Sequence, residues 1–481
     1  FIDCMYKKQS FWSNIIKQSS WYYLCSALNN GLAILLLPFL SRRLSTEEYG
    51  IIQLSTGIGL FLPMVFSCGI DRAIYRFFNE CRTHKAKKEL ISTVYWFVVI
   101  VGMVFLTIFV LSSSLWFKSV VHISPYPYVL LFAYPYLFAE LSTIGQSYFQ
   151  QVFDLKRMTI IEVIGTAINL LLSIYFVVTW DDGALARLVA ITISFFFKSS
   201  IYSYYLLKRN LLVFRCNYIK VWEYVKFSLP LLPNSISLWL SRTFDRILIS
   251  YYCGTAIAGV YSTAVQVSFV LYFIQDSVTQ AFGPMQIRLF IQNKVEAVRC
   301  LKIMSKIFYI IMLVSVVFLS SFCKEIMNFV LDEKFVPPVI VVALLSSVYI
   351  YQAQYRLFSD ILIYHKKNKY FMYAGIIQAV ISLLINIVFI PKYGYVVAGW
   401  SSLIAVMLYT LIIAYYSVKI ENLSLDYSFY IKYTLILMLA LFLLLNPLFN
   451  MDMHILLKLL LVSGILVFGV RDVFKLKKNI V

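Results

Sequence analysis

Long apolar stretches separated by short polar gaps run along the whole chain, and fourteen of them are long enough to cross a bilayer. An α-helix rises about 1.5 Å per residue, so about 20 apolar residues cross a hydrocarbon core about 30 Å thick. The pattern therefore predicts an all-α polytopic membrane protein with about 14 transmembrane helices. The predicted spans are 19–40, 49–70, 91–114, 127–150, 159–179, 184–207, 227–250, 257–281, 303–322, 337–358, 371–390, 396–417, 431–447 and 454–470.

Lysine and arginine are concentrated in alternate gaps, and this sets the predicted orientation. The gap 71–90 holds six of them and the gap 208–226 holds five, whereas 180–183 and 251–256 hold none. The positive-inside rule places the basic gaps, and with them both termini, in the cytoplasm. The formal net charge of +19 then follows largely from topology, so nucleic-acid binding is not needed to explain it.

Several kinds of chemistry lack the residues they would need. The gaps on the predicted outer side are at most fourteen residues long, which leaves no room for an exported catalytic domain. The eight cysteines form no CxxC pair, and none of the four histidines lies near the middle of a span. No GxxxxGK[ST] loop is present to cradle the phosphates of ATP. We therefore expect no catalytic residues, metal site or cofactor.

The gap 208–226 divides the chain into two similar halves. Arg43-Leu44-Ser45-Thr46-Glu47-Glu48-Tyr49-Gly50 leads into the second span, and Gly254-Thr255-Ala256-Ile257-Ala258-Gly259-Val260-Tyr261 leads into the eighth. Each is a polar or small-residue turn followed by tyrosine and an apolar helix. We predict two six-helix lobes, 1–207 and 227–417, around a central cavity. Residues 208–226 would link the lobes, and 418–481 would add two helices and a basic cytoplasmic tail.

The turn at 38–50 resembles the signature of polysaccharide-unit flippases, the O-antigen repeat-unit translocases of the multidrug/oligosaccharidyl-lipid/polysaccharide exporter superfamily. Leu229-Pro230, Asp245-Arg246 and Gly259-Val260-Tyr261 agree with that resemblance. It implies alternating-access movement of an undecaprenyl-diphosphate-linked oligosaccharide from the cytoplasmic to the outer leaflet of the bacterial inner membrane. It also implies a non-enzymatic role in lipopolysaccharide biosynthesis, with Na⁺ or H⁺ as a possible coupling ion and polymerase and chain-length proteins as possible partners.

The seventh predicted span carries the densest group of charges. Arg242, Asp245 and Arg246 stand at i, i+3 and i+4, so they share one helix face. A charge in hydrocarbon costs about 2.5–3.5 kcal/mol on insertion scales. Two cations against one anion leave a surplus, which favours a polar cavity over an internal ion pair. We expect Arg242 and Arg246 to contact the substrate and Asp245 to be their charge partner.

Three further charges lie deep in the first half. Arg187 and Lys198 are eleven residues apart, close to three helical turns, so they point the same way and form a cationic stripe. Glu140 lies near the centre of the fourth span. Because an unpaired central charge is costly, we expect Glu140 to pair with Lys198. Titration of Glu140 in cation coupling is the alternative.

The cytoplasmic ends of the spans carry cations that could receive a diphosphate. Arg72 and Arg76 follow the second span, and Arg356 ends the tenth. We count these three with the substrate-binding candidates, and Asp360 and Asp276 with the charge partners. Glu162 and Asp276 lie near the inner ends of the fifth and eighth spans, where such a residue is more often a satisfied interfacial group than a ligand. Pro63 predicts a bend within the second span.

Other functions stay open at this point. A peptidoglycan-precursor flippase would also have fourteen spans and a cationic cavity, but the turn at 42–50 argues against it. A cation-coupled multidrug exporter of the same superfamily would suit twelve spans and an acidic cavity. A membrane glycosyltransferase or O-antigen polymerase would need a longer outer loop than any gap here provides.

Overall fold

The computed structural model describes residues 36–78, 80–214, 217–229, 232–365, 367, 369–445, 458, 462–469 and 471–472. Within these ranges all regular structure is helical. The first predicted span, 19–40, and the last, 454–470, lie largely outside the described residues. The remaining predicted spans can be compared directly with the observed helices.

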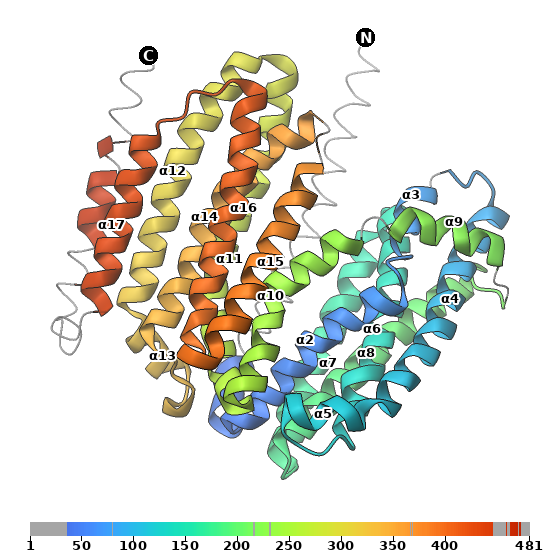
Figure 1. The fold of residues 1–481 in the computed structure, drawn as a ribbon. Coiled ribbons are helices and arrows are strands. Elements are labelled where there is room, and N and C mark those ends of the chain that lie inside the picture. The colour runs from blue at the N-terminus through green and yellow to red at the C-terminus, as the bar shows by residue number, and fades with distance from the viewer. Residues whose placement is uncertain are drawn as a thin grey trace. The chain divides into compact units, whose positions relative to one another are not determined.

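Each predicted span from 49–70 to 431–447 coincides with one helix (Figure 1). Nine helices among the described residues are long and apolar enough to cross a membrane. The prediction of an all-α, multi-pass membrane protein is confirmed, whereas the number fourteen stays a prediction. The helices are α2 (Thr46–Phe66), α4 (His84–Leu111), α6 (Tyr128–Gln151), α7 (Leu155–Thr179), α8 (Gly183–Lys208), α10 (Leu232–Cys253), α11 (Thr255–Gln292), α12 (Lys294–Ser321), α14 (Val339–Tyr364), α15 (Lys369–Tyr393), α16 (Val396–Glu421) and α17 (Tyr427–Leu445).

Short helices occupy several of the predicted gaps. They are α3 (Arg72–Phe77), α5 (Ser113–Val121), α9 (Tyr218–Ser228), α13 (Cys323–Val330) and the 3₁₀ turn η2 (Glu333–Phe335). The predicted linker 208–226 thus contains most of α9. Asn217 caps α9, and its side-chain amide donates to Glu89 of α4 at 2.7 Å. This hydrogen bond joins the linker to α4.

The described chain forms two compact units, whose boundary falls inside α10. Unit 1 comprises residues up to Trp239 together with 254–256, and unit 2 comprises 240–253 and the residues from Ile257 onward. The predicted lobes and the cavity between them stay a prediction.

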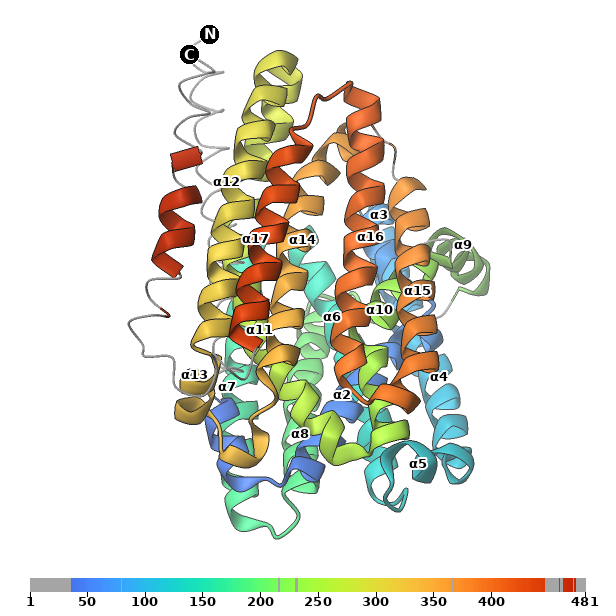
Figure 2. The ribbon, with the colours of Figure 1, turned by 60° about the vertical axis from the view of Figure 1, so that its left-hand side comes forward.

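In unit 1, α8 packs along both α6 and α7. Gly145 of α6 allows the closest approach, because a Cβ there would lie 2.4 Å from Cβ of Tyr202 on α8. In unit 2, α16 packs along α14 and α15 (Figure 2). Leu344 and Val348 of α14 form a buried cluster with Leu403 and Val406 of α16. Each unit thus has its own apolar core.

The signature turn at 42–50 serves to start α2. Ser45 is the N-cap: its hydroxyl accepts the Glu48 N–H at 3.1 Å, while Glu48 accepts the Ser45 N–H at 2.7 Å. The second oxygen of Glu48 accepts the N–H of Gly183, the first residue of α8, at 2.8 Å. One carboxylate therefore completes the starts of two helices.

Candidate functional site

A break between α2 and α3 places charged groups beside Glu140 in unit 1. Helix α2 continues past Pro63 and ends at Phe66, and the backbone then turns through left-handed conformations at Cys68 and Gly69, with φ of 52° and 66°. Interrupted membrane helices are typical of transporter binding sites. The interruption follows Pro63, which lies inside the last turn of α2, and the bend at Pro63 stays a prediction.

Glu140 of α6 is buried opposite this break. It is hydrogen-bonded to Ser67 and lies within electrostatic range of Asp71 and Arg72. Arg72 in turn donates to the hydroxyl of Ser235 at 2.6 Å. The cluster joins two carboxylates and one guanidinium, so it can carry a proton or exchange Arg72 for another cation. We refer to Ser67, Asp71, Arg72 and Glu140 as the α2–α3 charge cluster.

The predicted pairing of Lys198 with Glu140 is wrong. Lys198 of α8 instead forms an ion pair of 2.9 Å with Glu162 of α7. Glu162 also accepts from Gln146 at 2.7 Å and from Tyr202 at 2.9 Å. This carboxylate is buried and fully engaged, which is the arrangement that makes a buried charge tolerable. The predicted site residues left out Glu162, which lies near the inner end of the fifth predicted span.

Gly165 explains why Lys198 turns toward α7. A Cβ at this position would lie 2.5 Å from Cε of Lys198, so the lysine stem occupies the space that a side chain would take. The glycine stands three residues after Glu162, on the same helix face. The sequence could have indicated this ion pair. The helix before the one that carries Lys198 has a glutamate three residues before a glycine, which together offer a charge partner and space for the lysine side chain.

Arg187 does not share the surroundings of Lys198. Its guanidinium donates to Asn169 at 2.6 Å and also to Ser173, both on α7. Neutral oxygens therefore satisfy part of this cation, while its Nε has no hydrogen-bond partner among the described residues. Arg187 and Lys198 both contact α7, as their eleven-residue spacing predicts, but each has its own partners.

The charges of the seventh predicted span fall in the unit 2 portion of α10. Asp245 is buried, accepts the hydroxyl of Tyr261 on α11 at 2.5 Å, and interacts electrostatically with Arg246. Its partner Tyr261 belongs to the second signature turn, so that turn has a structural role in anchoring α11 to α10. The side chain of Arg242 lies outside the described residues.

Arg356 and Asp360 stand one turn apart on α14, where they interact electrostatically. Asp360 is buried, and neither its Oδ2 nor the Nε of Arg356 has a hydrogen-bond partner within the part of the chain that the structure describes. A partly buried guanidinium with an unused donor is a suitable site for an anionic ligand. Arg356 is the best candidate in unit 2.

The remaining predicted residues are less informative. Arg76 is exposed and forms an ion pair with Glu80, one turn further along. Asp276 lies half-buried in the middle of α11, at the end of the apolar part of that long helix.

Two carboxylates at helix ends in unit 2 form ionic contacts that were not predicted. Glu421, with its side chain fully buried, pairs with Lys294 at 2.9 Å and also with His365. Asp426 accepts from Lys306 at 2.8 Å, and this hydrogen bond holds the pKa of the Asp426 carboxyl below its usual range. The partners are separated by 56 or more residues in sequence, so spacing could not indicate them.

Comparison with known proteins places the chain in a family. The family described as polysaccharide biosynthesis protein matches residues 15–290, more than half of the sequence. The chain belongs to this family. A search of functionally curated proteins finds no match.

The fold of this chain is similar to the folds of solved membrane transporters. The lipid II flippase MurJ, in an inward closed conformation, is similar with a TM-score of 0.71 at 14% identity, over 96% of this chain and 99% of MurJ. An inward-facing multidrug resistance MATE family transporter of the MOP superfamily is similar with a TM-score of 0.63 at 14% identity, over 82% and 94% of the two chains. At such identity the likeness establishes the fold alone.

Proposed function

We propose that this protein is a flippase that moves an undecaprenyl-diphosphate-linked oligosaccharide from the cytoplasmic to the outer leaflet of the bacterial inner membrane, with both termini cytoplasmic. The family match supports a role in polysaccharide biosynthesis, and the fold is shared with a lipid flippase and with multidrug transporters. Under this proposal the protein makes and breaks no covalent bond of its substrate.

The observation that carries the proposal is the unsatisfied Nε–H of Arg356 on α14. Its Nε lacks a hydrogen-bond partner among the described residues, in a helix that is otherwise largely buried and apolar. Leaving such a donor unsatisfied costs about 1–3 kcal/mol, more when the group is charged. A diphosphate would offer the oxygens that satisfy it. We propose that Arg356 contacts the diphosphate, and that Arg72, Arg246, Arg242, Arg187 and Arg76 are secondary candidates.

The α2–α3 charge cluster suggests how binding is coupled to movement. Arg72 lies in electrostatic range of Glu140 and Asp71, so a diphosphate competes with these carboxylates for the same cation. Displaced carboxylates would then take up H⁺ or Na⁺. This cluster is where we propose that a coupling ion acts, if the transport is coupled.

Complementation of flippase-null bacteria tests the proposal. Each test strain lacks its own flippase and makes one defined repeat unit. A strain that makes the repeat unit this protein transports should regain surface polysaccharide when it expresses the protein. Arg356→Ala should reduce surface polysaccharide by about tenfold or more at equal membrane abundance, the effect of losing one charge-assisted hydrogen bond. Arg157→Ala is the matched control, because Arg157 is no substrate-binding candidate and its exposed ion pair with Asp154 contributes little. Equal activity of the two variants would remove Arg356 from the substrate path.

A peptidoglycan-precursor flippase is the second candidate, because the structural likeness to MurJ extends over nearly the whole of both chains. The family match and the turn at 42–50 favour a polysaccharide unit instead. Rescue of cells depleted of their lipid II flippase, without rescue of any polysaccharide strain, would favour this second candidate.

A further inference from the structure

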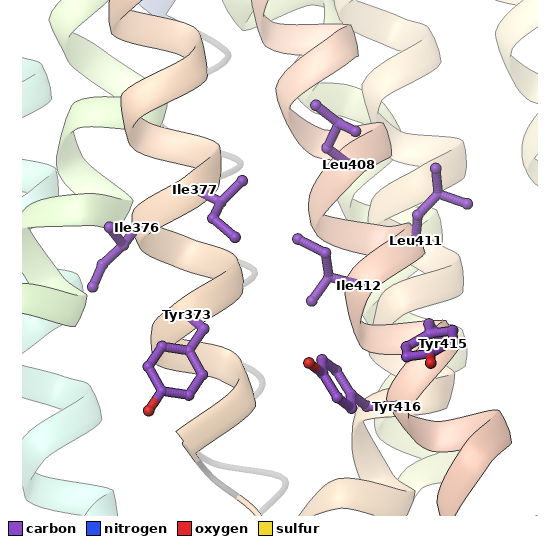
Figure 3. A pocket seen from close by; sticks show the side chains of 8 residues that line it. All are labelled: Tyr373, Ile376, Ile377, Leu408, Leu411, Ile412, Tyr415 and Tyr416. Atoms are coloured by element: carbon purple, nitrogen blue, oxygen red, sulfur yellow. The ribbon is translucent and has the colours of Figure 1, made fainter.

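A groove runs along the surface of unit 2 between α15 and α16 (Figure 3). Its volume of 530 Å³ lies within the range of about 300–1,000 Å³ found for small-molecule sites. The lining is aliphatic along most of its length and aromatic at one end. Its aliphatic walls are Ile376 and Ile377 from α15, and Leu408, Leu411 and Ile412 from α16.

The length of the groove along α16 is close to the thickness of the hydrocarbon layer of one membrane leaflet. From Leu408 to Tyr416 the helix advances eight residues, or about 12 Å, and half of a hydrocarbon core about 30 Å thick is about 15 Å. Its aromatic end lies near the start of α15 and the end of α16. The basic gap between α14 and α15 places that end on the predicted cytoplasmic side.

Three tyrosines and two lysines surround this cytoplasmic end. Figure 3 shows Tyr373, Tyr415 and Tyr416 gathered there, with the aliphatic side chains further along. Tyr416 stacks on Tyr370 with ring centroids 3.9 Å apart, which holds it in place.

Each of the two lysines has its ammonium group close to a tyrosine ring at this end of the groove. The Nζ of Lys369 lies 5.4 Å from the Tyr370 ring centroid, and that of Lys419 lies 5.9 Å from the Tyr415 ring centroid. Both lysines are exposed, so their ammonium groups are accessible to a lipid head group. The mouth therefore combines positive charge with aromatic faces, next to an apolar channel.

We propose that this α15–α16 groove binds the polyprenyl chain of the lipid-linked substrate next to its diphosphate, while the lipid is in the cytoplasmic leaflet. The inference rests on the proposed function. Packed helices are about 8–10 Å apart, so a groove between neighbours admits one hydrocarbon chain. A polyprenyl lipid has one chain, whereas a phospholipid has two and would leave the second outside. Lys369 and Lys419 would face the diphosphate.

Photolabelling measures occupancy of the groove without transport. The probe is a polyprenyl phosphate that carries a diazirine in the isoprenoid unit nearest to the phosphate, added to the purified full-length protein. We expect mass spectrometry to locate labelled residues on α15 between 373 and 377 and on α16 between 408 and 416. Labelling spread evenly over the exposed apolar residues of α15, α16 and α17 would overturn the proposal.

Competition distinguishes the two lipid sources. Unlabelled polyprenyl phosphate should suppress groove labelling, whereas the same concentration of phosphatidylglycerol should not. Equal suppression by phosphatidylglycerol would show an ordinary annular lipid site and contradict the proposal. The double variant Lys369→Gln/Lys419→Gln should make polyprenol and polyprenyl phosphate equally effective competitors, while Lys392→Gln, at the far end of α15, should not.

Filling the groove supplies a second, independent measurement. The double variant Ile376→Trp/Leu411→Trp should reduce labelling about tenfold. The two indole rings would prevent roughly two methylene groups of the lipid chain from being buried in the groove. Ile387→Trp is the matched control, since Ile387 is 40% exposed and lies on the same face of α15 as Ile376 but eleven residues further along. If the double variant does not fold, the wild-type label map and the competition still decide the outcome.

The two proposals fail in different ways. Groove labelling that competes with polyprenyl phosphate, together with no complementation of any flippase-null strain, would keep the groove and reject the flippase. Complementation that survives Ile376→Trp/Leu411→Trp, with no localised labelling of the wild-type protein, would keep the flippase and reject the groove.

Discussion

The sequence predicts where Lys198 lies in its helix, but not which residue it pairs with. Its place deep in a span predicts that it must be paired, and the pair exists, with Glu162 instead of Glu140. Four groups from three helices meet at this point: Lys198, Tyr202, Glu162 and Gln146. Such a network stabilises the packing of α6, α7 and α8, and it compensates the charge of Lys198 with that of Glu162.

The pair makes a specific prediction at the residue scale. Lys198→Met should lower membrane abundance, because removing one partner of a buried ion pair costs about 3–5 kcal/mol. Adding Glu162→Gln should restore abundance and transport together, since a neutral pair of similar size leaves no buried charge. Immunoblotting and surface polysaccharide measure the two effects.

Lys208→Met, at the exposed end of the same helix, is the control and should have no effect. A double variant that recovers abundance but no transport would show that Lys198 also serves the substrate. A double variant no better expressed than Lys198→Met would contradict this role of the network.

At the scale of elements, the start of α2 joins the signature turn to α8. Glu48 accepts the N–H groups of both Ser45 and Gly183. We expect Glu48→Ala to destabilise the protein by about 1–2 kcal/mol, the usual cost of a lost cap together with an unmet donor. Thermal unfolding of the purified protein measures this, and Glu47→Ala, an exposed neighbour, is the control. Equal unfolding temperatures for the two variants would show that the capping box is dispensable.

The contact between α12 and the segment before α17 predicts a pH effect. Lys306 donates to Asp426, and the pKa of this carboxyl is lowered. A lowered pKa means that the folded state favours the charged form, so the contact stabilises above the ordinary pKa of about 3.9 and is lost as the pH falls below it. Because Asp426 is half exposed, we expect less than about 1 kcal/mol.

The variant Asp426→Asn isolates that contribution. At pH 7 it should unfold slightly more easily than the wild type, and the difference should vanish at an acidic pH well below the lowered pKa of Asp426, because both side chains are then neutral in the folded state as well. Unfolding curves at both pH values provide the test. A difference that persists in acid would show that the asparagine disturbs the start of α17 instead.

For the whole molecule, the predicted orientation follows from the alternating positive charge of the gaps. Single cysteines introduced at 181–182 should react with a membrane-impermeant maleimide in intact cells, whereas cysteines at 85–88 should react only after permeabilisation. Labelling of 85–88 in intact cells would reverse the orientation. It would also move the tyrosine and lysine end of the α15–α16 groove to the outer leaflet.

The sequence alone determined which segments are helices and that they form a multi-pass membrane protein. In hydrocarbon every backbone polar group must find an internal partner, so an apolar segment of about 20 residues has essentially one solution, the helix. That constraint acts within each segment, and it is why the predicted spans from 49–70 to 431–447 each coincide with a helix. The charges that would need partners could likewise be recognised one residue at a time.

Only the tertiary structure decided which of those charges meet. The rotation and depth of α7 relative to α8, with Gly165 opening the space, bring Glu162 to Lys198. The left-handed turn at Cys68 and Gly69 interrupts the second span and brings Asp71 and Arg72 to Glu140. The α15–α16 groove exists because side chains of two packed helices line it from both sides. Each depends on packing between helices, a property that no single segment of sequence contains.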